Sequence, residues 1–189
     1  MHRIHHIALT LLAGAVAAAC DGSAPSEPTT QAAMSQGREQ VPFHETYHAS
    51  GAIAPSTSCP GSTLLVSLNG GGTATHVGRY TITNSHCLDL ATGAFTGGTF
   101  TKTAANGDQL SGTYSGIGTV IVAPNPVGEF AVNGTLTFTG GTGRFAGATG
   151  TASMTGQESI NFTGLPFPTV ISLVFDGSIS PVGAAREPQ

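Results

Sequence analysis

Hydrophobic and polar residues alternate with a period of two along most of the chain from Val41 onward. The clearest run is 129–139, which places Phe130, Val132, Leu136 and Phe138 on one face and mostly threonines on the other. The same alternation occurs at 64–68 and 171–179, with weaker runs at 43–52, 76–85, 94–103, 109–122 and 150–158. The pattern predicts about eight strands, each with an apolar and a polar face.

Turn-forming residues separate these runs and favour a simple up-and-down order. We expect turns at 70–72, at 105–108 with its Asn106-Gly107 pair, and at 124–126, and at most one helical turn, at 144–148. Closing such a sheet removes its open edges. The sequence therefore predicts an all-β fold, a single small antiparallel barrel over 41–180 with an apolar lumen and a threonine-rich exterior. A two-sheet sandwich has the same periodicity and stays open as an alternative.

Composition supports strands and excludes one class of partner. Only 8% of the 189 residues are charged, and 27 are glycine, which disfavours helices. The formal net charge is −4, and the chain has no run of basic residues. Because binding to nucleic acid requires clustered Lys or Arg, we expect no nucleic-acid partner.

The N-terminus has the features of an export signal. The apolar stretch at 7–19 is too short to span a bilayer, which needs about 20 residues, so 1–19 is predicted to be a signal peptide. Ala17, Ala18 and Ala19 precede Cys20 and resemble a bacterial lipobox, with Ala17 in place of the usual Leu. We expect lipidation at Cys20, a membrane partner through that anchor, and a location in the cell envelope, in the periplasm or at the cell surface. The alternative is an ordinary secreted protein with a free thiol.

Two polar segments flank the predicted barrel. Residues 20–40 are rich in Ser, Pro, Thr, Ala and Gln without apolar periodicity, which predicts a flexible tether after the anchor. Residues 181–189 are expected to form a disordered tail.

With Cys20 acylated, Cys59 and Cys87 remain. Export to an oxidising compartment favours a disulfide between them. Two free thiols, or a metal pair together with His86, are the alternatives. A zinc site requires four ligands, and these residues supply three, so no metal site is predicted.

One segment resembles a known family. The stretch 138–150, Phe-Thr-Gly-Gly-Thr-Gly-Arg-Phe-Ala-Gly-Ala-Thr-Gly, is similar to the glycine-rich turn of allene oxide cyclase and dirigent-type barrels. The resemblance extends over about 41–180 and implies a calycin-like, eight-stranded barrel whose lumen can hold an apolar molecule. The plant enzymes of this type act without a cofactor, so none is expected here. No catalytic residue is carried over, and Phe145 is expected to plug one barrel end.

Strand parity gives a set of candidate ligand-binding residues. If the faces that bear the aromatic residues point inward, the lumen contains Glu45, Tyr47, His76, Tyr80 and Tyr114. A buried Glu45 would then be a candidate acid or base. The alternative is that each tyrosine packs its ring and satisfies its hydroxyl locally, with His76 a hydrogen-bonding residue at a strand start. His44 and His48 share a face but lie about 13 Å apart in a strand, too far apart to hold one metal ion.

These observations lead to three hypotheses of function. The first is an exported envelope lipoprotein whose barrel binds a small apolar ligand. The second is a cofactor-free isomerase or cyclase of the allene oxide cyclase type, and the third is a structural or adhesive envelope module. The volume of the lumen and its polar lining are the features that distinguish them.

Overall fold

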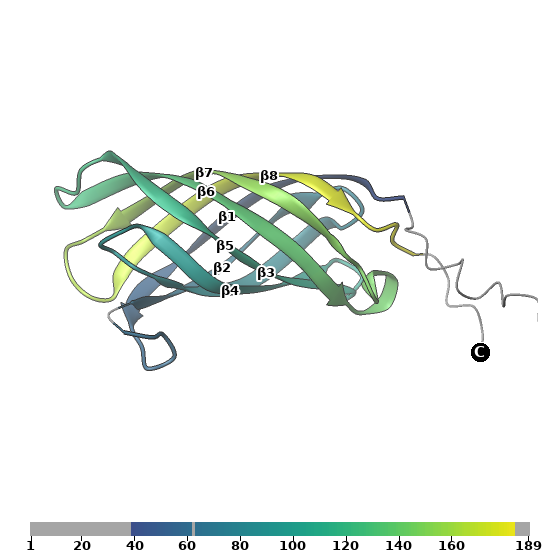
Figure 1. Ribbon diagram of the computed structural model, residues 1–189, viewed down its shortest axis with the longest axis horizontal. Coiled ribbons are helices and arrows are strands. Elements are labelled where there is room, and N and C mark those ends of the chain that lie inside the picture. The colour runs from purple at the N-terminus through teal and green to yellow at the C-terminus, as the bar shows by residue number, and fades with distance from the viewer. Residues whose placement is uncertain (1–38, 62, 184–189) are drawn as a thin grey trace, which may run out of the picture. The chain divides into compact units, whose positions relative to one another are not determined.

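The computed structural model describes residues 39–61 and 63–183, which form a closed barrel of eight antiparallel strands (Figure 1). The predicted all-β barrel is confirmed. Its elements in chain order are β1 (Val41–Pro55), β2 (Leu64–Ala74), β3 (Gly78–Leu88), β4 (Ala94–Ala104), β5 (Gln109–Val122), β6 (Val127–Gly141), the 3₁₀ turn η2 (Gly143–Phe145), β7 (Gly150–Asn161) and β8 (Phe167–Ile179).

Each strand pairs with its neighbours in sequence, and β1 pairs with β8 to close the wall. The β1–β8 register runs from Val41 opposite Ile179 to Ile53 opposite Phe167. This closure excludes the sandwich alternative. No helix within the described ranges has the length and apolar character needed to cross a bilayer.

The predicted strand faces agree with the observed burial. In β8, for example, Ile171, Leu173, Phe175 and Ile179 are buried and the residues between them are not. The Asn106-Gly107 turn and the turn at 124–126 lie where the sequence predicts them. The helical turn predicted at 144–148 corresponds to the 3₁₀ turn η2, which begins one residue earlier, at Gly143, and already ends at Phe145.

The predicted turn at 70–72 is wrong, because these glycines lie inside β2. Gly72 pairs with Tyr47 on β1 and with Tyr80 on β3. A Cβ atom at Gly72 would lie 1.9 Å from the Thr46 carbonyl oxygen and 2.7 Å from the Tyr80 hydroxyl. Glycine is therefore required here for the close approach of neighbouring strands and not for a chain reversal.

Several inward glycines face a large side chain on the adjacent strand. A Cβ atom at any of them would lie 2.4–2.9 Å from that side chain. In a tightly curved sheet, a large residue that leans over a glycine fills the interior without straining the strand. The cross-strand pairs are Gly72 with Tyr80, Gly98 with Tyr114, Gly112 with Phe100, Gly116 with Phe95, Gly134 with Met154, and Gly156 with Leu173.

The barrel has a plugged end, formed by the β2–β3 and β4–β5 turns and η2, and a disulfide end, formed by the other four loops. Phe145 of η2 is fully buried at the plugged end, as predicted. The Arg144 guanidinium lies 4.7 Å from the Phe145 ring centroid and donates a hydrogen bond to the Val77 carbonyl at 3.0 Å. Arg144 therefore holds the plug in place.

The predicted signal peptide, Cys20 and most of the tether lie outside the described residues. Of the predicted C-terminal tail, Val182 packs against the core, and the Gly183 N–H donates to the Arg144 carbonyl at 3.0 Å. Residues 184–189 are not described.

Candidate functional site in the barrel lumen

Three polar side chains meet at the centre of the lumen. Glu45 of β1 and Lys102 of β4 are completely buried and form an ion pair. The Lys102 ammonium donates to one carboxylate oxygen of Glu45, and the Tyr80 hydroxyl donates to the other. Both oxygens of Glu45 are thus satisfied by side chains from two other strands, which is the condition for a charge to remain buried.

Aromatic rings surround the Lys102 ammonium. Its Nζ lies 4.9–5.9 Å from the ring centroids of Phe43, Tyr80, Phe100, Phe138 and Phe175. Rings at this distance stabilise a cation through their quadrupole. Burial lowers the pKa of Lys102, while the Glu45 carboxylate opposes the shift. Burial and the same carboxylate raise the pKa of Tyr80, so its hydroxyl stays a proton donor.

A cavity lies beside this triad, toward the disulfide end. Its volume is about 30 Å³, room for about two water molecules. The wall is mostly apolar, with contributions from Leu68, Val132 and Met154. The polar lining residues are Tyr47, Asn84, His86, Lys102, Tyr114 and Glu158.

Four of these polar residues form a hydrogen-bonded string. The Tyr47 hydroxyl donates to Asn84 Oδ1 at 3.0 Å, and Asn84 Nδ2 donates to the Tyr114 oxygen at 3.1 Å. The Tyr114 oxygen lies 2.9 Å from His86 Nδ1, a hydrogen bond in which the donor depends on the His86 tautomer. Burial lowers the pKa of His86 to about 4 and raises the pKa of both Tyr47 and Tyr114. The string is therefore neutral at neutral pH.

Glu158 of β7 faces the same cavity without a charged partner. Its carboxylate accepts a hydrogen bond from Thr169 Oγ1 at 2.6 Å, and it takes part in no ion pair among the residues that the structure describes. Burial raises the pKa of Glu158, and the Thr169 hydrogen bond opposes the shift. Glu158 thus holds its proton to higher pH than an exposed glutamate.

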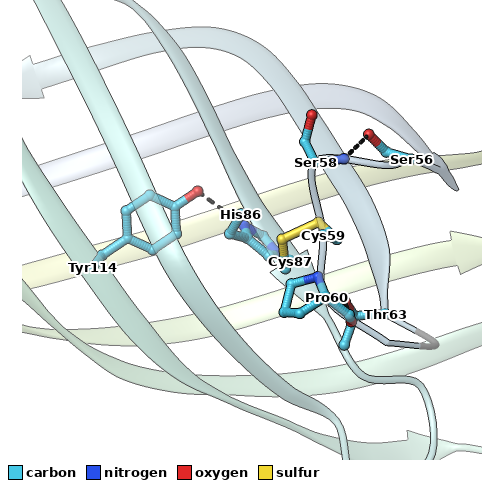
Figure 2. The surroundings of a disulfide bond; sticks show 8 residues. All are labelled: Ser56, Ser58, Cys59, Pro60, Thr63, His86, Cys87 and Tyr114. Atoms are coloured by element: carbon cyan, nitrogen blue, oxygen red, sulfur yellow. Dashed lines mark hydrogen bonds between the residues drawn. A yellow bond between two sulfur atoms is a disulfide. The ribbon is translucent and has the colours of Figure 1, made fainter.

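The predicted disulfide joins Cys59 and Cys87, whose Cα atoms lie 5.5 Å apart (Figure 2). Cys59 belongs to the β1–β2 loop, and Cys87 directly follows His86 on β3. Figure 2 shows the bond beside the His86–Tyr114 contact. The disulfide therefore fixes the loop next to the polar string.

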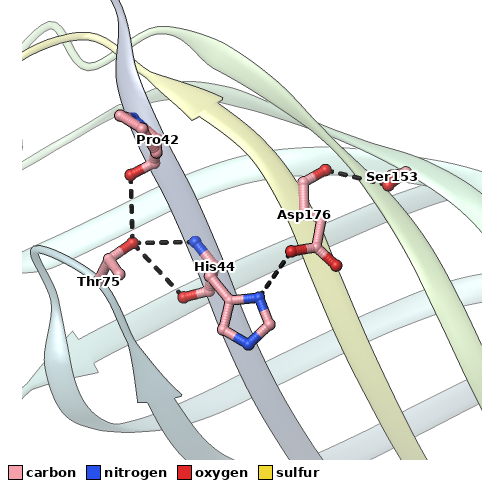
Figure 3. Close-up of polar contacts among 5 residues, drawn as sticks. All are labelled: Pro42, His44, Thr75, Ser153 and Asp176. Atoms are coloured by element: carbon pink, nitrogen blue, oxygen red, sulfur yellow. Dashed lines mark hydrogen bonds and ion pairs between the residues drawn. The ribbon is translucent and has the colours of Figure 1, made fainter.

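The other histidines of the barrel lie on its outer surface. His44 Nδ1 lies 2.6 Å from Asp176 Oδ1, and the His44 backbone N–H donates to Thr75 Oγ1 at 2.9 Å (Figure 3). His48 Nδ1 lies 2.9 Å from Ser172 Oγ. Over the described part of the chain, no three His, Cys, Asp or Glu side chains lie close enough to share a metal ion.

His76 does not lie in the lumen, so its predicted placement is wrong. It is exposed in the β2–β3 turn, with a positive φ of 66°, and its Nε2 lies 3.1 Å from the Pro42 carbonyl. The chain reverses at this residue, so strand parity does not apply to it. Glu45, Tyr47, Tyr80 and Tyr114 do lie in the lumen, and their role in ligand binding stays a prediction.

The sequence reasoning missed four lumen residues, namely Asn84, His86, Lys102 and Glu158. The rule that every second residue of a strand points to the same face could have found each of them. Asn84 and His86 follow Tyr80 and Ile82 at every second position, Lys102 follows Phe100, and Glu158 follows Met154 at the fourth position. A polar residue on an otherwise apolar face was the available signal.

Comparisons with known proteins assign no residue roles to this chain. No protein-family model and no curated protein match the sequence. Among solved structures, a pterocarpan synthase dirigent protein matches with 15% identity and a TM-score of 0.41, over 82% of this chain and 93% of that chain.

Proposed function

We propose that the protein binds a small, largely apolar molecule with one hydrogen-bonding group in its lumen, as a lipid-anchored protein of a bacterial cell envelope. The observation that carries the proposal is the convergence of Asn84, His86, Tyr114 and Glu158 on one cavity with otherwise apolar walls. Asn84, Tyr114 and His86 bond one another, whereas Glu158 is half-buried, accepts one hydrogen bond from Thr169 and has no charged partner among the described residues, so it has hydrogen-bonding capacity left for a ligand. Apolar pockets with a few convergent polar groups are typical of ligand sites.

The size of the cavity constrains how a ligand binds. Small-molecule sites have volumes of roughly 300 Å³ or more, whereas this cavity has about 30 Å³. A ligand must therefore move lining side chains. Met154 is suited to this because its unbranched side chain adapts its shape easily, and it packs over Gly134, where no side chain opposes it.

The proposed location is supported by the sequence before the barrel. A short apolar segment at 7–19 ends in three alanines before Cys20. Metabolic labelling with an alkyne fatty acid tests the anchor. Labelling of the wild-type chain but not of Cys20→Ser supports it, and an unlabelled wild-type chain contradicts it.

Thermal unfolding of the full chain with Cys20→Ser, in the presence of lipids, terpenoids and phenolic compounds, tests ligand binding. A ligand at 100 times its Kd stabilises the fold by about 2.7 kcal/mol, which raises Tm by roughly 5–10 °C. We expect Glu158→Gln or Tyr114→Phe to weaken the response to the active compound. Glu129→Gln is the matched control, because Glu129 lies outside the cavity lining. No shift with any compound, or equal shifts in all variants, contradicts lumen binding.

Cofactor-free acid–base catalysis of the allene oxide cyclase type is a second candidate. It is favoured by the raised pKa of Glu158 beside the Tyr114 hydroxyl string. A carboxyl group of this kind can give a proton to a bound molecule or take one from it. Exchange of carbon-bound hydrogen in a bound ligand, followed by NMR in D₂O, distinguishes the candidates. Exchange lost in Glu158→Gln, with binding retained, supports catalysis, and binding without exchange contradicts it.

A further inference from the structure

The β5–β6 hairpin carries an exposed aliphatic surface at the disulfide end. Ile117, Val120, Ile121, Val122 and Val127 are 41–57% exposed. Figure 1 shows this hairpin reaching beyond the neighbouring β3–β4 loop. Apolar side chains gathered on one protruding element mark an interaction surface more often than scattered ones do.

One side of this hairpin is an open sheet edge. The β4–β5 pairing ends at Ala94 opposite Ile117. Beyond it, the Gly118 N–H donates to the Gly93 carbonyl at 2.9 Å. From Thr119 to Val122, β5 pairs with β6 alone, because the β3–β4 loop turns away. We call residues 119–122 the β5 edge.

The β5 edge lacks charged residues and prolines, two of the features that protect open strands from pairing, while it has two others, a short length and a bulge. No charged residue occurs between Gly116 and Gly128, and Thr119, Val120, Ile121 and Val122 are all β-branched. Ile121 is the extra residue of a bulge opposite β6, and its side chain remains 53% exposed.

We infer that the β5 edge pairs antiparallel with the β5 edge of a second copy of this chain. Water satisfies the exposed backbone groups of this edge in a single chain, and an extended strand can replace that water with a ladder of hydrogen bonds, which a hydrocarbon surface cannot. A two-fold axis lets each edge satisfy the other and closes the assembly. The uncharged edge also allows two chains, each with a formal net charge of −4, to meet without direct repulsion.

Sedimentation of the full chain tests this pairing. Cys20→Ser is included throughout, so that an acyl chain cannot cause association. We expect a monomer–dimer equilibrium that Ile121→Lys weakens at least about tenfold, because a charge at an edge opposes strand pairing. Val174→Lys is the matched control. Val174 is an aliphatic residue 37% exposed on β8, which is paired on both sides, so this variant should dimerise as before.

A cross-linking experiment tests the geometry of the contact. With Cys20 replaced and Cys59 bonded to Cys87, Thr119→Cys supplies a single free thiol on the β5 edge. We expect oxidation to give a disulfide-linked dimer, whereas Thr137→Cys on the outer face of β6 should remain monomeric. Unchanged circular dichroism verifies the fold of each variant.

Three results would overturn the inference. They are a wild-type chain that stays monomeric at all concentrations, a dimer that persists in Ile121→Lys, and cross-linking of Thr137→Cys as efficient as that of Thr119→Cys. Binding of monomers to phosphatidylcholine vesicles, lost in Ile121→Lys, would assign the surface to lipid instead.

Discussion

Replacing Glu45 with glutamine tests the structural importance of the buried triad. The substitution keeps the size of the side chain but leaves the Lys102 ammonium without a counter-ion, where both residues are completely buried. Removing one partner of such a pair costs about 3–5 kcal/mol. For a domain of this size, the loss corresponds to a fall in Tm of roughly 6–20 °C.

The loss depends on pH through Lys102. Burial lowers the pKa of Lys102, and the Glu45 carboxylate is the group that opposes this shift, so in Glu45→Gln the pKa falls further. The unfolded chain then binds more protons than the folded chain between the lowered folded pKa and the unfolded value of about 10.4. Stability therefore rises with pH in that window. We expect the cost of Glu45→Gln to be greatest near neutral pH and to shrink toward about pH 10.

Urea unfolding followed by circular dichroism measures both effects. Glu129→Gln is the control, with an expected change within about 0.5 kcal/mol. The double variant Glu45→Leu, Lys102→Met replaces the pair by apolar side chains and should unfold within about 1 kcal/mol of wild type or later. A cost below about 1 kcal/mol for Glu45→Gln at pH 7 would refute the reasoning, as would a double variant no more stable than the single one.

Three further predictions concern other parts of the barrel. Replacing Cys59 and Cys87 by serine opens a loop with a sequence separation of 28 and should lower the free energy of unfolding by about 3–4 kcal/mol in urea; an unchanged midpoint would contradict this. Met154→Ala should lower the free energy of unfolding by about 2–5 kcal/mol and enlarge the cavity, so that more xenon binds in crystals of the variant than in crystals of wild type. Equal xenon occupancy in the two crystals would show instead that the cavity wall collapses. Because burial lowers the pKa of His86 to about 4, below the unfolded value of about 6.5, wild type should lose about 3 kcal/mol as pH falls through this interval. The His86→Phe variant should not show that part of the loss. Parallel curves of unfolding free energy against pH for wild type and variant would contradict this prediction.

The strands were predictable because the barrel wall imposes a period of two on the sequence. All eight predicted runs overlap a strand, and parity correctly placed Glu45, Tyr47 and Tyr80 inside. The glycines at 70–72 were misread because a glycine marks either a chain reversal or a close approach of strands. Only the partner strands, which bring Thr46 and Tyr80 against Gly72, decide between the two.

The candidate site was less predictable because it depends on contacts across the barrel. Lys102 is separated from Glu45 by 57 residues, and a lysine is almost never fully buried unless it is paired. Parity could place Lys102 on the inner face, but nothing local in the sequence names its partner. The same holds for the string from Tyr47 to His86, which draws on three strands. His76 fails for the opposite reason, since a local reversal ended the strand before it.

The pairing of β1 with β8 places the first and last strands side by side, with Val41 opposite Ile179. This contact joins the most distant parts of the barrel sequence, so its formation bears a large loop-closure entropy. A circular permutant, with a short linker from Gly183 to Glu39 and new termini between Asn106 and Gly107, turns this contact into a local hairpin. The cut makes the β4–β5 pairing the contact between first and last strands, so such a chain should form the same barrel with a similar contact order and refold at a similar rate.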